Sequence, residues 1–428
     1  MFGLSRYQWF VLFAAWLGWG FDVFDGLLFN YVAPVCVPNL LGLDPHDPHV
    51  RQQTLFWTAT LTSLLLLGWA LGGIIFGKIT DRLGRTRTLL LTMLTYALAT
   101  AACAAAPNLW TLAGLRFIAS LGIGGEWAAG AALVAETMPA SRRVLGGALL
   151  YTSAPAGLFL ATFVNDLFTR KLNAIALNPN LSWRLVFLTG IVPAVVAILI
   201  RINVREPEVW RPEKHPRIRE LFEGDLARRT LGGLAMAVVA LVTWWSCSAF
   251  IPVVASFLTS ELRPVPVGAE LARRKTELIT LGATTFNIGG LLGTLLTVPI
   301  ATHFGRRPMF AAYFLASAAA ILLTFALPWP PHIRLIMMFT VGLTVFGVFG
   351  SFTFYLPELF PVRLRGTGAG FTYNVGRIIT AAFPFAVGWV ARSGKDPLEI
   401  MSFVAVVPAL GCVAALAGVA LETRKLNL

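Results

Sequence analysis

The chain has 428 residues, of which 57% are apolar and only 13% charged. Soluble domains have about 45–50% apolar and 25% charged residues, so the composition excludes an ordinary soluble enzyme and predicts a polytopic membrane protein. The apolar runs must be helices, because lipid offers no partners for unpaired backbone groups. The net charge of +13 is interpreted as a basic inner face, with no role in nucleic-acid binding.

Twelve apolar runs follow one another, and each is long enough to cross a bilayer as a helix. Six precede and six follow a polar stretch at 205–229, which we interpret as a cytoplasmic linker. The prediction is an all-α membrane protein with six-helix bundles over 1–204 and 230–428. The predicted spans are 7–36, 53–77, 87–106, 109–137, 144–168, 183–204, 230–259, 277–302, 308–328, 333–357, 367–391 and 397–421.

The distribution of Lys and Arg predicts the orientation of these spans. If the N-terminus is inside, the inner segments hold about twice as many basic residues as the outer loops. We therefore expect both termini to be cytoplasmic, in a multi-pass protein of a bacterial inner membrane. We expect a monomer whose partners are the lipid bilayer, a small organic anion and a proton.

A charged pattern occurs twice, once after the fourth predicted span and once after the tenth. Glu136-x2-Pro-x3-Arg143 returns 222 residues later as Glu358-x2-Pro-x3-Arg365. The registered repeat predicts that the two halves of the chain are related to one another.

The loop between the second and third spans carries an element that the second half repeats only in part. There, Thr302 stands in place of the aspartate and only a glycine-arginine pair is kept. The complete element in the first half consists of Gly77, Asp81, Arg82, Gly84 and Arg85.

The repeated charges are predicted to form ion pairs at the cytoplasmic face when the cavity opens outward and to separate when it opens inward. A surface pair contributes only about 0–1 kcal/mol, so a network is needed to bias such an equilibrium. Positive-inside anchoring alone explains the arginines but not the registered glutamates. The predicted gate consists of Gly77, Asp81, Arg82, Gly84, Arg85, Glu136, Arg142, Arg143, Glu358, Arg363 and Arg365.

Together these elements resemble those of the major facilitator superfamily. The Gly77 to Arg85 element is similar to its loop between spans two and three, and the two Glu-x2-Pro-x3-Arg patterns resemble its sugar-porter and metabolite:proton symporter branches. The stretches 116–127 and 370–376 look most like the sialate/carboxylate:proton symporters. The resemblance covers essentially the whole chain, and it implies two pseudo-symmetric bundles that alternate in access.

Asp22, Asp25, Arg116 and Glu126 lie deep within the first four predicted spans, where each is costly unless it is paired or hydrated. Asp22 and Asp25 share one helical face, and their depth matches that of Arg116 on span four. The hypothesis is that one aspartate binds the proton with Arg116 as its partner, which is also what the resemblance implies. The alternative is a static ion pair. Glu126 is a further candidate, for the proton route or for a cationic part of a substrate.

Arg377 lies near the middle of span eleven and is the candidate anion-binding group, because a guanidinium binds a carboxylate through two hydrogen bonds. Tyr373 and Asn374 precede it by one turn and offer neutral hydrogen bonds. The alternative is a latch to the other half, with Glu126 as partner. Trp244, which stands where the repeat would place Asp22, is a candidate stacking surface for substrate, although such residues are often core or lipid-facing.

The predicted function is proton-coupled symport of a small organic anion such as sialate, lactate or an aromatic acid. A proton-coupled or facilitative carrier of a neutral sugar is the alternative, since it would share the gate but have less need of Arg377. We expect neither an enzyme nor a bound metal or cofactor, because the five histidines lack ligand spacing and no nucleophile-base cluster occurs in a span.

Overall fold

The computed structural model describes residues 4–43, 50–83, 85–139, 143–168, 178–196, 217–266, 268–361, 364–391 and 397–422. All regular structure in these ranges is helical, which confirms the predicted all-helical fold. The predicted gate residues Gly84, Arg142 and Arg363 lie outside the described residues. Of the predicted linker, the described part begins at Arg217 and contains the turn η4 (Ile218–Phe222) and the first residues of α10.

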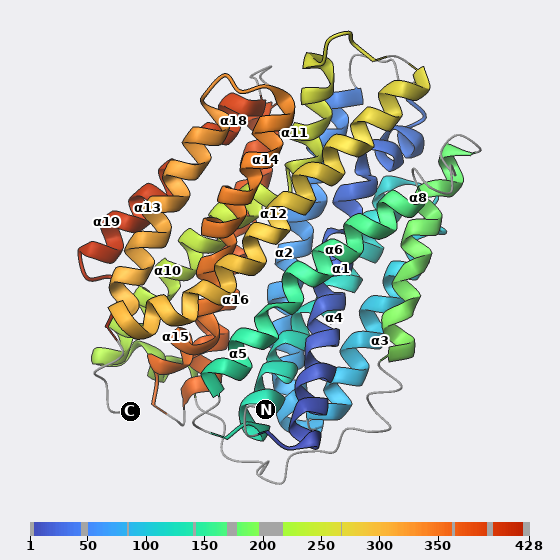
Figure 1. Cartoon of the computed structure of the whole chain (residues 1–428). Helices are drawn as coiled ribbons and strands as arrows, with labels where there is room; N and C mark the ends of the chain where they lie inside the picture. Colours follow the sequence, from blue (N-terminus) through green and yellow to red (C-terminus); the bar gives the residue numbers. More distant parts are fainter. Residues whose placement is uncertain are drawn as a thin grey trace.

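The first bundle, coloured blue to green in Figure 1, is built from long helices and one tandem pair. The pair is α5 and α6, which meet at Thr152. The described helices of this bundle are α1 (Arg6–Leu41), α2 (Val50–Leu83), α3 (Arg85–Cys103), α4 (Leu109–Thr137), α5 (Arg143–Tyr151), α6 (Ser153–Asp166), and α8 (Pro179–Leu188) with η3 (Thr189–Ile191).

The second bundle, coloured yellow-green to red, has more interruptions. Together the helices and tandem helices of both bundles follow the twelve predicted spans, and seven of them meet the length and composition of a membrane span within the described residues. The helices of the second bundle are α10 (Asp225–Ser248), α11 (Ile251–Leu258), η5 (Thr259–Glu261), α12 (Gly268–Phe304), α13 (Arg306–Phe325), α14 (Pro331–Val341), η6 (Gly342–Phe346), η7 (Gly347–Ser351), α15 (Phe352–Glu358), α16 (Arg365–Thr380), α17 (Ala382–Ala391), α18 (Pro397–Phe403) and α19 (Val406–Leu416).

Local sequence signals set the ends of the helices that carry the buried charges. At the start of α1, the Ser5 side chain accepts a hydrogen bond from the Gln8 backbone, and the Gln8 side chain accepts one from the Ser5 backbone. The same helix ends at Gly42, whose φ of 65° is left-handed. Asn108 caps α4 by accepting from the backbone N–H of Thr111.

Glycines bring α4 close to its neighbours. A Cβ added at Gly122 would lie 2.7 Å from the carbonyl oxygen of Thr92 on α3, and one added at Gly124 would lie 2.7 Å from the backbone nitrogen of Gly73 on α2. No larger residue fits such crossings, where backbones meet directly. The close packing holds Arg116 and Glu126 of α4 in the interior of the first bundle, beside α1.

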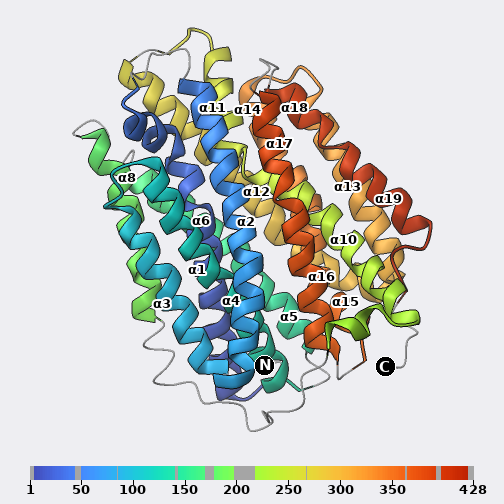
Figure 2. The ribbon, with the colours of Figure 1, turned by 180° about the vertical axis from the view of Figure 1, so that it is seen from behind.

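The two bundles touch on both sides of the middle of the molecule. In Figures 1 and 2, α11 and α18 lie at one end and α5 and α15 at the other. Toward the first end, Phe56 of α2 contacts Phe385 of α17, with ring centroids 6.4 Å apart. Toward the second end, a Cβ added at Gly147 of α5 would lie 3.1 Å from the Thr353 hydroxyl of α15. The space between the bundles is therefore narrow at both ends.

The tenth membrane helix, which runs from α14 to α15, loses regular α-helical geometry where it passes the centre of the molecule. A π-turn over Gly342–Phe346 is followed by a 3-10 turn over Gly347–Ser351. The Thr297 hydroxyl of α12 donates to the carbonyl oxygen of Gly347 at 2.6 Å and supports the irregular segment. Such interruptions occur often at functional sites, and this one directs Phe346 and Phe349 inward.

Candidate functional site

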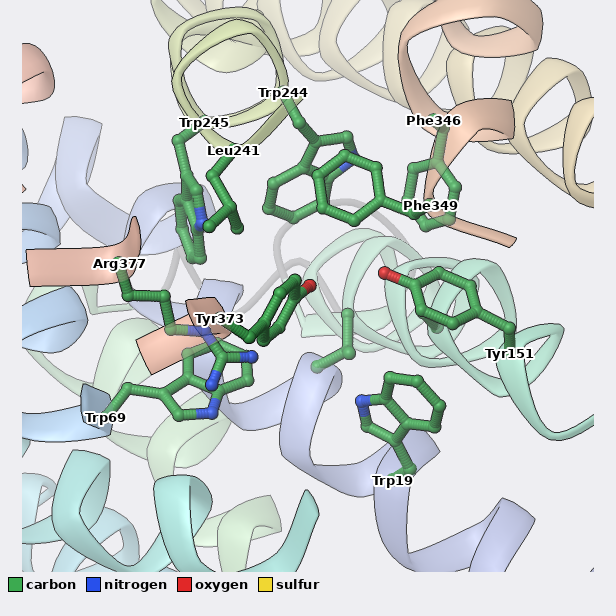
Figure 3. A pocket seen from close by; sticks show the side chains of 12 residues that line it. Trp19, Trp69, Tyr151, Leu241, Trp244, Trp245, Phe346, Phe349, Tyr373 and Arg377 are labelled. Carbon is green, nitrogen blue, oxygen red and sulfur yellow. The ribbon is translucent and has the colours of Figure 1, made fainter. Parts of the chain in front are cut away.

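A cavity lies between the bundles, and side chains from both bundles line it (Figure 3). Its volume is about 40 Å³. The cavity is therefore a narrow slot in this conformation. Its lining residues are Trp19, Val23, Trp69, Tyr151, Ala154, Leu241, Trp244, Trp245, Phe346, Phe349, Tyr373 and Arg377.

Arg377 supplies the charged group of this lining, and its side chain is buried. Its guanidinium carbon lies 4.3 Å from the ring centroid of Trp69 on α2 and 4.5 Å from that of Tyr373 on α16. Its Nη1 donates to the Asn374 side-chain oxygen at 3.2 Å. The aromatic contacts and this hydrogen bond fix the plane of the guanidinium at the edge of the cavity.

Asn374 is held in turn by both bundles. Its amide nitrogen donates to the carbonyl oxygen of Gly370 at 2.9 Å. A Cβ added at Gly73 of α2 would lie 2.8 Å from that nitrogen, so the glycine makes room for Asn374 at the junction of α2 and α16. Asn374 is a support of Arg377 and does not itself line the cavity.

Trp244 lies at the centre of an aromatic wall formed by the second bundle. Its ring meets those of Trp245 (4.8 Å), Phe346 (5.6 Å) and Phe349 (6.0 Å) edge to face. The first bundle adds Trp19 and Tyr151, whose rings are 4.6 Å apart.

Polar groups project into this aromatic lining from several sides. The hydroxyls of Tyr151 and Tyr373 point toward one another from opposite bundles (Figure 3). The indole nitrogens of Trp69 and Trp244 are buried and have no hydrogen-bond partner within the described part of the chain. The cavity thus offers a cation, two unsatisfied N–H donors and two tyrosine hydroxyls in a mainly aromatic surface.

The structure pairs Arg116 with Asp25. Arg116 Nη1 donates to Asp25 Oδ1 at 2.5 Å, and Nη2 donates to the backbone carbonyls of Asp25 at 2.7 Å and Gly26 at 3.1 Å. The Thr100 hydroxyl also reaches the Asp25 carboxylate, at 2.6 and 2.7 Å. Both charged side chains are buried. The pair is buried, neutral overall and well supplied with hydrogen bonds.

Asp22 lies one turn away on α1 and has different surroundings. It is fully buried, and no donor among the described residues reaches either of its carboxylate oxygens. The carboxyl group of Glu126 faces it from α4, and Glu126 Oε2 also lacks a donor. The other oxygen of Glu126 is packed against Gly18 of α1. The four ionisable residues predicted from the sequence thus divide into two unlike pairs.

One charge of the predicted gate has a described partner. Glu358 receives two hydrogen bonds from Arg306, at 2.7 and 3.1 Å. Arg306 belongs to the glycine-arginine pair that the second half retains from the repeated loop element. The backbones of the remaining gate residues belong to α2, α3, α4, α5 and α16, but the surroundings of their side chains, or of the glycine, lie outside the described part; these residues are Gly77, Asp81, Arg82, Arg85, Glu136, Arg143 and Arg365.

Sequence reasoning missed most of the aromatic lining. Trp19, Trp69, Tyr151, Phe346 and Phe349 were not predicted as site residues, although all five line the cavity. Aromatic residues are frequent throughout the apolar spans, so their type alone does not distinguish them. A glycine pair within a long span, as at 342 and 347, is the one local signal that points to Phe346.

Two six-helix bundles around a central cavity, with buried charges in both bundles, define a secondary transporter. A family model described as Major Facilitator Superfamily matches residues 8–384, and the chain belongs to that superfamily. This confirms the predicted fold and family and identifies the chain as a multi-pass membrane transporter, not an enzyme.

Relatives with printed functions extend over most of the chain. A probable 4-methylmuconolactone transporter of Cupriavidus pinatubonensis is 29% identical, covering 88% of this chain and 82% of the relative. The cis,cis-muconate transport protein of Acinetobacter baylyi is 27% identical, covering 83% and 84%. The sialic acid transporter NanX of Escherichia coli is 25% identical, covering 92% and 90%.

A solved structure shares the fold. It is a bacterial homologue of the human lysosomal transporter Spinster, in an inward-facing and occupied conformation. It covers 97% of each chain with a TM-score of 0.66 and 15% sequence identity. At this identity the likeness concerns the fold alone.

Proposed function

We propose that the protein carries a small organic anion across the membrane together with a proton, by alternating access of the central cavity. The observation that carries the proposal is Arg377, a buried arginine held at the edge of an aromatic cavity between the bundles. A buried guanidinium is costly unless an anion compensates it, and a carboxylate matches its planar donor geometry.

The surroundings of Arg377 favour a carboxylate over a neutral ligand. The unsatisfied indole N–H groups of Trp69 and Trp244 can donate only, so they suit the oxygens of an acid. The rest of the lining is mainly aromatic carbon, which suits a flat ring or a conjugated chain.

A planar unsaturated acid therefore fits the cavity better than a sugar. A sugar has hydroxyl groups on both faces, and each would need a polar partner on burial. Among the relatives, the muconate and methylmuconolactone transporters favour an unsaturated acid as cargo, whereas NanX keeps sialate among the candidates.

The gate is proposed to lie at the α5/α15 end, where Glu358 and Arg306 pair and the repeated charged patterns are placed. We propose that this end faces the cytoplasm, with both chain termini on that side, in the inner membrane of a bacterium. We also propose that one chain suffices for transport, because the cavity is completed by the two bundles of a single chain. Bundle rocking about a central site is the general mode of such folds.

The test is substrate-driven proton movement in proteoliposomes. A panel of cis,cis-muconate, nicotinate, sialate, lactate and D-xylose is added outside, and alkalinisation of the outer medium is recorded, with protein-free liposomes to correct for passive entry. We expect a response to at least one acid that is lost in Arg377→Ala and kept in Arg263→Ala, an exposed arginine outside the cavity. A response to xylose would instead support the neutral-sugar carrier, and an acid response that survives Arg377→Ala would contradict the anion-binding role of Arg377.

A further inference from the structure

The inference concerns how the proton and the anion are coupled, and it rests on the proposed function. α1 carries two buried aspartates, and both are within reach of other charged groups. A buried carboxylate requires a cation, hydrogen-bond donors or a proton. The two aspartates meet this requirement differently, and the difference separates a structural charge from a titrating one.

Asp25 has a cation and a hydrogen-bond donor in fixed positions. The guanidinium of Arg116 and the hydroxyl of Thr100 both bind its carboxylate, and Arg116 also donates to the adjacent backbone carbonyls. A proton added to Asp25 would displace the guanidinium and leave Arg116 buried without its counter-ion. Asp25 and Arg116 are therefore best placed to remain a permanent ion pair.

Asp22 lacks such support, because no hydrogen-bond donor of the described protein reaches its oxygens. The charged groups near it are Glu126 of α4, its neighbour Asp25 on α1, and Arg377 of α16. Tyr96 of α3 faces Glu126 from the far side. Two ionised carboxylates facing each other in a buried site repel, whereas a proton placed between them supplies the missing hydrogen bond.

Counting charges shows what the arrival of an anion requires. Asp25 and Arg116 cancel. With one proton shared between Asp22 and Glu126, the pair carries a single negative charge, which balances Arg377. A substrate carboxylate that binds Arg377 adds one negative charge to a buried site. A second proton on the pair restores neutrality and removes the competing charge from the field of Arg377.

We propose that Asp22 and Glu126 form one proton-sharing carboxyl pair that takes up a second proton when a carboxylate binds Arg377, so that one proton is carried with each substrate molecule. The step balances, because the proton is taken from water on the open side, bound as O–H on the pair, and released with the anion on the other side. The first, shared proton remains in the protein throughout the cycle. A monocarboxylate is then carried without net charge.

One test needs no substrate. Infrared difference spectra of the purified protein, recorded as the pH is raised and lowered, report protonated carboxyl groups by their C=O stretch. We expect a buried carboxyl band in the wild type that is lost or shifted in both Asp22→Asn and Glu126→Gln, and unchanged in Asp225→Asn, an exposed aspartate paired with Arg229. A band that is unaffected by either substitution would overturn the pair.

The second test measures binding, using the four tryptophans of the cavity as the reporter. Quenching of tryptophan fluorescence by nicotinate or cis,cis-muconate is titrated at several pH values. In the wild type, affinity for a monoanion falls about tenfold per pH unit where binding takes up one proton. The double variant Asp22→Asn/Glu126→Gln mimics the fully protonated pair, so it should bind the acid with a pH-independent affinity.

Transport by the same variants separates this inference from the proposed function. Asp22→Asn and Glu126→Gln should retain exchange of labelled for unlabelled acid across the membrane but lose uphill uptake driven by a pH gradient. Uphill uptake that survives in both variants contradicts the proton pair and leaves the anion carrier intact. A wild type that moves no acid contradicts the proposed function, while the infrared result still decides whether the pair holds a proton. A gel-filtration profile of each variant confirms that it is folded before its infrared and transport results are interpreted.

Discussion

Arg377 of the second bundle lies with its guanidinium carbon 4.3 Å from the ring centroid of Trp69 in the first. The contact crosses the boundary along which the bundles must move for the cavity to change sides. The residue proposed to hold the anion is therefore also in contact with the opposite bundle, and binding at Arg377 can act directly on the relative position of the two bundles.

Replacing Trp69 tests this contact. Trp69→Ala removes the ring from the guanidinium and the N–H from the cavity, and a cation–π contact in a dry site contributes about 0.5–2 kcal/mol. We expect the KM for the transported acid to rise about 3- to 30-fold. Trp69→Phe keeps a ring and should show the smaller part of the loss.

Uptake kinetics over a range of acid concentrations measure the effect. Trp389→Phe, at a tryptophan that is 67% exposed, is the control and should be unchanged. Equal kinetics for Trp69→Ala and the wild type would show that the ring does not contribute to binding of the acid.

The Asp25–Arg116 pair is expected to contribute to stability. Arg116→Ala leaves Asp25 buried without its cation, and breaking a buried pair by removing one partner costs about 3–5 kcal/mol. We expect a clear fall in the thermal unfolding temperature in detergent. The double variant Asp25→Asn/Arg116→Gln removes both charges and should recover part of the loss. A double variant less stable than Arg116→Ala would contradict this account.

Gly18 provides a steric test of Glu126. An added Cβ would overlap the Glu126 carboxyl group, lying 3.0 Å from its Cδ and closer still to Oε1. Gly18→Ala should displace the carboxyl group from Asp22 and reduce uphill uptake, while exchange is retained. Gly114→Ala on α4 is the matched control, because nothing lies within 4 Å of its added Cβ. Paired measurements of uphill uptake and exchange distinguish displacement of Glu126 from a general loss of protein.

The Glu358–Arg306 pair should affect the rate of the cycle more than binding. Glu358 is half-buried and its two hydrogen bonds to Arg306 lie at one end of the bundles, so Glu358→Gln should weaken the pair by up to about 1 kcal/mol. We expect a change of up to about fivefold in maximal uptake rate with little change in KM. Asp225→Asn, which breaks an exposed i,i+4 pair with Arg229, should leave both unchanged.

The sequence was sufficient for the architecture because membrane helices are specified by continuous apolar length, and the twelve predicted spans follow the described helices closely. It also identified the residues Asp22, Asp25, Arg116, Glu126 and Arg377, since ionisable side chains are rare in spans. The sequence did not show which of these residues pair with one another. Asp22 and Asp25 share one face of α1, and whether Arg116 meets the first or the second depends on a fraction of a turn in how α1 and α4 are rotated.

The aromatic lining was less predictable for a related reason. It is assembled from α1, α2, α5, α10, α16 and the irregular segment after α14, so no local pattern contains it. Trp244 was predicted as a candidate stacking surface for substrate, but Phe346 and Phe349 beside it were not. The π-turn at Gly342–Phe346 shifts the register of the residues that follow, and a prediction based on regular helical spacing cannot place Phe349.

The repeated charged patterns relate the two halves of the chain, yet the positions equivalent to Asp22 and Asp25 are Trp244 and Cys247. In the proposed assignment, the first half supplies the site of the driving ion and the second half supplies the arginine that binds the cargo. Substitutions among Trp244, Phe346 and Phe349 can then change what is carried without altering what drives it, so new cargoes can evolve on an unchanged source of energy.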